Sequence, residues 1–571
     1  MKTRYFFFCY LFFFPFFSFA TDRYDILINE IMEDPNVSGG NTFGLPDADY
    51  IELYNRSDHP IELENFSLEV GTKAILFPAY TFPPNAYLIV SKTGNEEFQN
   101  YGATLLIATF PSLTSTKSVI LKDMFGVVID ALTYEQDWYR SNRANGGYSL
   151  ERISPFQPCE ASNNWIATAA LIGGTPGQEN SVFSMEVDTD APSIRNVYPI
   201  ASNQVRVTFS EAMQELDILN KDLFTITGNT IESIELTKND FSEILLTLNQ
   251  ALAPTIVQEL KLSTTVRNCV GNAIDTNNLA PLALPSRAIA GDILINEVLF
   301  NPATGGSDFI ELYNHSDKVI DLNTLVVINQ QQDNPVGIPV IVEKLVFPQE
   351  YVVLTESPSA ITNHYVVNNP SDLLQQDLPT LTNQAGNITV FTNDFAATNI
   401  LDQFDYSEDM HTSLLNDEDG VSLERLRFDV PTQDVANWQS AAATAGYATP
   451  TQRNSQAITP TGEGRAEGQA FTLSPTTISP DGDGFADLLQ INYALDQAGY
   501  TASIHIYDAA GRLLKKVAQN IPLGTSGSFT WDGTTADGNK APVGIYVVWV
   551  EYFSVTGGKG QQKEVVVVAG K

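Results

Sequence analysis

The sequence contains few of the residues that build common active sites. Only three cysteines and five histidines occur among 571 residues, and the histidines never fall at metal-ligand spacing. No HExxH, CxxC or Gly-x-Ser-x-Gly element is present, and the glycine pairs lack the lysine of a phosphate-binding loop. These absences argue against the zinc, thiol, serine-nucleophile and nucleotide-binding enzymes that short motifs identify. We therefore expect a protein that is not an enzyme.

Positive charge is also scarce. Lys and Arg number 31 against 68 Asp and Glu, which gives a formal net charge of −37. Such a surface repels nucleic acid and anionic lipid, so neither is an expected partner. Simple solubility is the plainest role of this charge, and the binding of cations or basic partners is the alternative.

Long apolar runs are missing after the first twenty residues. Residues 1–20 combine Lys2 and Arg4, a Phe-rich run and a final Ser18-Phe19-Ala20, the pattern of a secretory signal peptide. A membrane anchor is the rival interpretation, but the run is only about 15 residues long and Pro15 interrupts it, whereas a span needs about 20. Cleavage would remove two positive charges, so that −37 becomes −39. We expect an extracellular or outer-surface protein without a transmembrane segment after cleavage.

Cysteine usage predicts no disulfide framework. Cleavage leaves only Cys159 and Cys269, and these fall in different expected modules.

Two parts of the chain carry the same short motifs in the same order. Ile26–Glu30 recurs as Ile293–Glu297, and Tyr50–Asn55 recurs as Phe309–Asn314. The matches that end both copies are Ser149–Arg152 with Ser422–Arg425, Asn164-Trp165 with Asn437-Trp438, and Thr175-Pro176 with Thr449-Pro450. This many ordered matches predict two homologous units.

Each copy reads as short β-branched and aromatic stretches separated by Pro, Gly, Asn and Asp, which is typical of an antiparallel sandwich. Within Tyr50–Asn55, Ile51 and Leu53 face one side of the strand and Glu52 faces the other. At these motifs the copies resemble the lamin tail domain, over residues 21–184 and 288–456. The resemblance implies immunoglobulin-like sandwiches of a kind that also occurs in secreted bacterial proteins.

Two further modules differ from this pair. Residues 185–287 contain the alternating strand Gln204–Phe209 and resemble the bacterial Ig-like domains of surface proteins. After a polar linker at 457–467, residues 468–571 resemble the Ig-like module of flagellar hook-capping proteins and the type B sorting domains of type IX secretion. The expected fold class is therefore all-β, with four tandem immunoglobulin-like β-sandwiches.

The best metal candidate lies in the last module. Asp481, Asp483 and Asp487 fall within seven residues, with glycines that let the loop curl. Oxygen-only ligands on a flexible loop suit Ca²⁺. The alternative is a turn rich in Asp and Gly that binds no metal.

Other candidates for chemistry are weaker. Glu30 with Glu52, and Glu297 with Glu311, have the residue types of a glycosidase acid–base pair, but their recurrence in both copies favours a structural role. Trp138-Tyr139, in an irregular segment beside two arginines, is the candidate for an exposed binding site.

Three functional hypotheses follow. The leading one is a secreted or cell-surface protein without enzymatic activity that mediates adhesion, scaffolding or the binding of extracellular polymers. The second is a calcium-stabilised carbohydrate-binding accessory to secreted hydrolases. The third is a hydrolase that uses the repeated glutamates.

Overall fold

The computed structural model describes residues 21–570 with short gaps, and the predicted signal peptide at 1–20 lies outside the described residues. The gaps fall at 38–39, 115, 141, 160–161, 255, 277, 332–335, 394–399, 416, 459–468, 496–499 and 555–557. Contacts divide the chain into two units: unit 1 ends at Ala251 and adds Gln258–Leu282, and unit 2 comprises Leu252–Val257 and Ala283–Lys571. In the described part, no helix is both long and apolar enough to cross a membrane.

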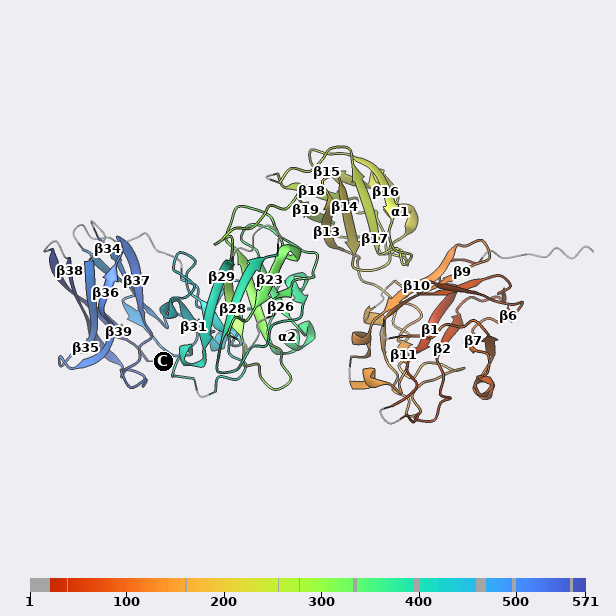
Figure 1. The fold of residues 1–571 in the computed structure, drawn as a ribbon, viewed down its shortest axis with the longest axis horizontal. Helices are drawn as coiled ribbons and strands as arrows, with labels where there is room; N and C mark the ends of the chain where they lie inside the picture. Colours follow the sequence, from red (N-terminus) through yellow and green to blue (C-terminus); the bar gives the residue numbers. More distant parts are fainter. Residues whose placement is uncertain are drawn as a thin grey trace, which may run out of the picture. The chain divides into compact units, whose positions relative to one another are not determined.

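The first lamin-tail-like copy is a sandwich of two sheets (Figure 1). The six-stranded sheet runs in the order β12 (Trp165–Ala167), β11 (Leu150–Arg152), β1 (Ile26–Met32), β2 (Tyr50–Asn55), β7 (Tyr87–Lys92), β8 (Thr104–Ile107). The four-stranded sheet runs in the order β10 (Val128–Tyr134), β9 (Lys117–Lys122), β4 (Ser67–Val70), β5 (Lys73–Leu76), and β3 (Ile61–Glu62) pairs with β6 (Thr81–Phe82).

The six-stranded sheet is buried on both faces. This explains why buried and exposed residues do not alternate along its central strands. Ile51 and Leu53 belong to the main core between the sheets. Tyr50 packs instead in a second apolar cluster with Met32 and Phe98. The side chains between these apolar positions are therefore enclosed as well, even where they are polar.

The second copy repeats this topology strand for strand. Its six-stranded sheet runs in the order β27 (Leu373–Gln375), β26 (Tyr351–Thr355), β21 (Phe309–Asn314), β20 (Ile293–Leu299), β30 (Leu423–Arg425), β31 (Trp438–Ser440). The second sheet is β24 (Ile338–Pro339), β23 (Leu325–Ile328), β28 (Ala385–Thr392), β29 (Ile400–Ser407), and β22 (Ile320–Asp321) pairs with β25 (Leu345–Val346). Helix α2 (Pro358–His364), between β26 and β27, takes the place of the 3-10 helix Glu96–Asn100 between β7 and β8. The predicted repeat is confirmed by this shared order.

The segment that completes unit 1 also forms two antiparallel sheets. They are β13 (Ile194–Ala201), β14 (Gln204–Phe209), β17 (Glu243–Leu248), β16 (Ile231–Leu236), and β15 (Phe224–Ile226), β18 (Gln258–Leu262), β19 (Leu279–Leu282). A single turn of helix, α1 (Glu215–Ile218), lies between β14 and β15 in the chain. Val205, Val207 and Phe209 of β14 are buried while their neighbours are partly exposed, as the alternation predicted.

The C-terminal part of unit 2 is a further sandwich. Its sheets are β32 (Phe471–Ser474), β34 (Leu489–Ala494), β37 (Ser526–Trp531), and β33 (Thr477–Ile478), β39 (Lys559–Val568), β38 (Gly544–Ser554), β35 (Tyr500–Asp508), β36 (Leu513–Leu523). Trp531 and Phe471 anchor its core. The all-β class of tandem sandwiches is confirmed, whereas the module boundaries stay predictions and the linker at 457–467 falls mostly outside the described residues.

Candidate functional site

Three buried glutamates lie side by side on neighbouring strands of the first copy. In the register of the sheet, Glu30 on β1 faces Glu52 on β2 and Glu151 on β11. Each of the three is fully buried, at 0 % exposure. Burying a carboxyl group is costly unless it is hydrogen-bonded, so its partners decide what it does.

The partners come from the segment that follows β12 and closes the first copy. Its backbone amides and hydroxyls donate to the carboxylates: Thr175 N to Glu30 Oε1 at 2.8 Å, Thr175 Oγ1 to Glu151 Oε1 at 2.8 Å, Gly177 N to Glu52 Oε2 at 2.5 Å and Ser181 Oγ to Glu151 Oε2 at 2.8 Å. Asn180 adds donors to the carbonyls of Asn29 at 3.0 Å and Arg152 at 2.8 Å. We call residues 175–182 the first closing segment.

The second copy reproduces this cluster with the corresponding residues. Glu297 faces Glu311 and Glu424 in the register, and all three are buried. The second closing segment, residues 449–456, makes these hydrogen bonds: Thr449 N to Glu297 Oε1 at 2.8 Å, Thr451 N to Glu311 Oε2 at 2.6 Å, Thr449 Oγ1 to Glu424 Oε1 at 2.7 Å and Ser455 Oγ to Glu424 Oε2 at 2.8 Å.

Burial controls the protonation of these groups. It raises the pKa of Glu30 to about 7, with the neighbouring Glu151 carboxylate adding to the rise. In the second copy burial, followed by Glu424, raises the pKa of Glu297 to about 8. Burial and the Glu30 charge hold the pKa of Glu52 well above its ordinary value. The clusters therefore keep protons that exposed glutamates would release.

This arrangement favours a structural role for the repeated glutamates. Most oxygens that an acid–base catalyst would present to a substrate accept hydrogen bonds from the same chain, and Glu30 Oε2, which has no such partner, is buried. The carboxyl groups hold each closing segment on its sheet.

Sequence reasoning missed several members of the clusters. In the sequence, Glu151 and Glu424 stand out only as members of the repeated Ser-Leu-Glu-Arg motif. The next residue of that motif, Arg152, is 2 % exposed and forms a buried ion pair with Asp130 at 2.7 Å. The available signal for these residues was their place in the repeat, because the Glu-Arg pair occurs at the same position of both copies.

The aspartate loop is a compact turn in which one carboxylate, that of Asp487, accepts most of the hydrogen bonds. Oxygens of Asp481, Asp483 and Asp487 lie within 4.8 Å of one another. Asp487 is buried and accepts hydrogen bonds from three backbone amides, those of Asp481 at 3.1 Å, Gly482 at 2.8 Å and Gly484 at 2.7 Å. These contacts agree with the alternative of a metal-free turn, while calcium binding stays a prediction.

The prediction that Trp138 and Tyr139 form an exposed site is wrong. They are 6 % and 3 % exposed and belong to the main core of the first copy. Trp138 packs near Trp165, with ring centroids 6.3 Å apart. The short helical turn at Gln136–Tyr139 directs both rings inward, which the irregular sequence of the segment does not indicate.

The cysteine prediction is also wrong. Cys159 and Cys269 form a disulfide within unit 1, although 110 positions separate them. Backbone hydrogen bonds hold the same place together, from Ala212 N to Cys159 O at 3.1 Å and from Cys269 N to Ala212 O at 2.9 Å. The bond joins loops of different sheet pairs, and no local spacing reveals such a connection.

Comparisons with known families match most of these sandwiches. A model of the lamin tail domain matches residues 20–136 and 286–423, and a model of the FlgD Ig-like domain matches residues 476–555. The two resemblances stated from sequence, to the lamin tail and to the hook-capping module, are thereby confirmed. A search of curated proteins gave no match.

Similar solved structures are distant. CopC from Methylosinus trichosporium OB3b is 23% identical, with 15% of this chain and 76% of that chain covered and a TM-score of 0.12. The N-terminal part of the bacterial S-layer protein SbsC is 10% identical, with 38% and 44% covered and a TM-score of 0.17. SGBP-B of the Bacteroides ovatus mixed-linkage glucan utilization locus, in complex with a mixed-linkage heptasaccharide, is 10% identical, with 84% and 86% covered and a TM-score of 0.16. Likenesses this small support no functional argument.

Proposed function

This chain carries two lamin tail domains and a FlgD Ig-like domain, and from that premise we propose that it is a secreted or cell-surface protein without enzymatic activity. Its sandwiches serve adhesion, scaffolding or the binding of extracellular polymers. Localisation outside the cytoplasm, the absence of turnover and the nature of the ligand are all parts of this proposal.

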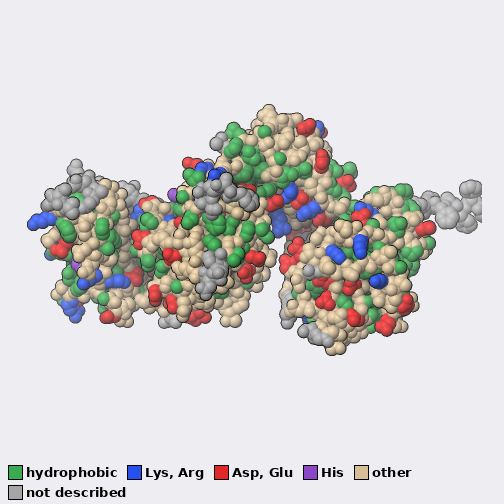
Figure 2. All heavy atoms as spheres, in the orientation of Figure 1, with side chains coloured by type: hydrophobic (Ala, Val, Ile, Leu, Met, Phe, Trp, Pro, Cys, Tyr) green, Lys and Arg blue, Asp and Glu red, His purple; other side chains and the backbone are tan. Residues whose placement is uncertain are grey.

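The observation that carries the proposal is the disulfide between Cys159 and Cys269. Disulfides form and persist in oxidising compartments, and the bacterial cytoplasm keeps thiols reduced. The bond therefore supports export, in agreement with the signal peptide expected at residues 1–20. On the face drawn in Figure 2, acidic side chains are spread over both units, which suits a solvent-exposed protein of net negative charge.

The use of the buried glutamates supports the absence of turnover. Neither cluster exposes an acid–base pair to solvent, because the glutamates are buried and residues of the closing segments donate hydrogen bonds to them. A protein built in this way presents its surface, and not a reactive pocket of carboxylates, to its surroundings.

Surface labelling of intact cells with a membrane-impermeant amine reagent tests the proposal. We expect the full chain to be labelled, and a cytoplasmic marker protein to stay unlabelled in the same cells. Labelling only after lysis would contradict it. The third hypothesis is tested separately: any hydrolase activity that persists in the double variant Glu30→Gln with Glu297→Gln does not come from these glutamates.

A further inference from the structure

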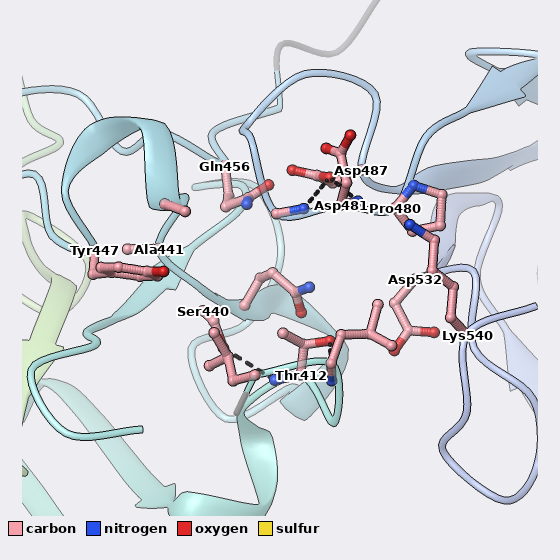
Figure 3. A pocket seen from close by; sticks show the side chains of 15 residues that line it. Thr412, Ser440, Ala441, Tyr447, Gln456, Pro480, Asp481, Asp487, Asp532 and Lys540 are labelled. Carbon is pink, nitrogen blue, oxygen red and sulfur yellow. Dashed lines mark hydrogen bonds between the residues drawn. The ribbon is translucent and has the colours of Figure 1, made fainter. Parts of the chain in front are cut away.

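Unit 2 contains a cavity of about 390 Å³ where loops of the second lamin tail copy meet loops of the C-terminal sandwich (Figure 3). Its volume lies in the usual range of small-molecule sites. A hydrogen bond from Ala443 N to Gly482 O at 2.7 Å joins two of its walls, and next to the lining Ser413 Oγ donates to Gly538 O at 2.6 Å. Contacts between the second lamin tail copy and the C-terminal sandwich therefore hold the walls of the cavity together.

Two of the carboxylates at the cavity already accept hydrogen bonds from the protein. Asp487 accepts the three loop amides described above. Asp532 accepts hydrogen bonds from Lys515 Nζ at 3.1 Å and from Thr534 Oγ1 at 2.6 Å. The other two charged groups of the lining, Asp481 and Lys540, are exposed and opposite in sign. Three aspartates against one lysine leave this lining with a negative charge, which repels an anionic ligand.

Neutral hydrogen-bonding groups line the remaining walls. Ser440 lies in the wall, but its buried hydroxyl is already engaged, at 2.9 Å from His411 Nδ1 and accepting from Thr412 N at 3.0 Å. Gln456 is held in place because its backbone amide donates to Glu424 Oε2 at 2.7 Å, and its side chain lines the cavity, as does that of Gln439. An amide both donates and accepts hydrogen bonds, which matches the dual character of a ligand hydroxyl group.

One aromatic ring of the lining sits on an unusual backbone. Tyr447 has φ +70, a left-handed conformation that costs free energy for any residue with a Cβ. The equivalent position of the first copy is Gly173, with φ +95. The equivalence is shown by the carbonyls, since Tyr447 O accepts Ser422 N at 3.0 Å and Gly173 O accepts Ser149 N at 2.9 Å.

In the first copy a glycine adopts this left-handed conformation without strain. In the second copy a tyrosine occupies the position, although the conformation is strained for a residue with a Cβ. The Tyr447 side chain is 40 % exposed and lines the cavity opposite Asp532 and Lys540 in Figure 3. Strained residues of this kind persist where the side chain has a use. A flat, partly exposed ring beside neutral amide groups provides a surface for stacking.

We propose that this cavity binds a neutral saccharide, with one sugar ring stacked on Tyr447 and its hydroxyl groups bound by Gln439 and Gln456. The apolar C–H face of the sugar covers the ring, and the amide groups exchange hydrogen bonds with the hydroxyls. Binding of this kind is measured on purified protein, so it stands or falls independently of where the cell places the chain.

The test is a glycan array probed with the full chain, with neutral oligosaccharides of glucose, mannose, galactose and xylose beside uronic-acid and glucosamine oligosaccharides. We expect at least one neutral glycan to bind. Its affinity should fall about tenfold or more in Tyr447→Gly and in Gln456→Ala, and should be largely kept in Tyr447→Phe, which retains the ring. Phe125→Ala, which removes a ring that is 83 % exposed in unit 1, is the control and should bind as the parent does.

Tyr447→Gly also separates lost binding from lost folding, because glycine relaxes the backbone and should leave the melting temperature unchanged or higher. The proposal is overturned if no neutral glycan binds, if only charged glycans bind, or if Tyr447→Gly binds as tightly as the parent chain.

Discussion

Each lamin tail copy contains the same kind of carboxylate cluster, but the two copies differ in how they are attached to the sandwich that follows. In unit 1 a disulfide makes the attachment, between Cys159 and Cys269. Unit 2 contains no cysteine and uses hydrogen bonds such as Ala443 N to Gly482 O, beside a cavity. The glutamates therefore belong to the fold itself, whereas the attachments are particular to each copy.

The largest expected effect is the loss of the disulfide. Its removal frees a loop of about 110 residues, which by loop entropy destabilises unit 1 by about 5 kcal/mol at most. Cys159→Ser with Cys269→Ser, or reduction, should lower the unfolding temperature of unit 1 in calorimetry. The transition of unit 2 should not move, and equal shifts in both would contradict the comparison.

A second effect concerns the buried ion pairs. Arg152→Ala leaves Asp130 buried without its cation and should cost about 4 kcal/mol. The matching change Arg425→Ala should cost less, because the pair with Asp402 is longer, at 3.3 Å, and Asp402 also accepts Thr432 Oγ1 at 2.5 Å. Native-state hydrogen exchange of β1 and β20 in the full chain measures both losses. A larger loss in Arg425→Ala would reverse the ranking.

The pH dependence of stability should also differ between the two copies. Folded Glu30 keeps its proton up to about pH 7, and folded Glu297 up to about pH 8, whereas the unfolded chain releases both near pH 4.5. The stability that Glu30 and Glu297 contribute is therefore fullest below pH 4.5 and falls as the pH rises, until about 7 for Glu30 and about 8 for Glu297. The loss attributable to Glu30 is about 3 kcal/mol.

Pulse proteolysis in urea between pH 5 and pH 9, with fragments identified by mass spectrometry, follows each copy separately. Glu30→Gln should flatten the slope of the first copy only, and Glu297→Gln that of the second. Glu62→Gln, at an exposed glutamate, is the control. A stability that rises with pH in this window would contradict the assigned protonation.

Much of this architecture could be predicted from the sequence, because the repeat and the strand patterns are local signals. Ile51 and Leu53 face the core as their alternation requires. The disulfide and the closing segments could not be predicted, since they join residues that are distant in the chain. The prediction for Trp138 and Tyr139 was wrong for another reason. Whether a large aromatic residue in an irregular segment is buried or exposed depends on tertiary packing alone.

The smallest expected effect is at the aspartate loop. Asp487→Ala removes the acceptor of three backbone amides and should destabilise the C-terminal sandwich by about 1–2 kcal/mol, whereas Asp481→Ala at an exposed position should have little effect. Thermal melts with EDTA and with added Ca²⁺ should coincide if the loop is a turn alone. A melting temperature that rises with Ca²⁺ in the parent but not in Asp487→Ala would establish a calcium site.

The central claim, that the buried glutamates hold the closing segments in place, is tested most directly by amide exchange at Thr175, whose N–H donates to Glu30 Oε1. Glu30→Gln retains an oxygen at that position and should keep the Thr175 amide protected. Glu30→Ala removes the acceptor, and the amide should exchange much faster while β9 in the other sheet stays protected. Unchanged protection of Thr175 in Glu30→Ala would contradict the account.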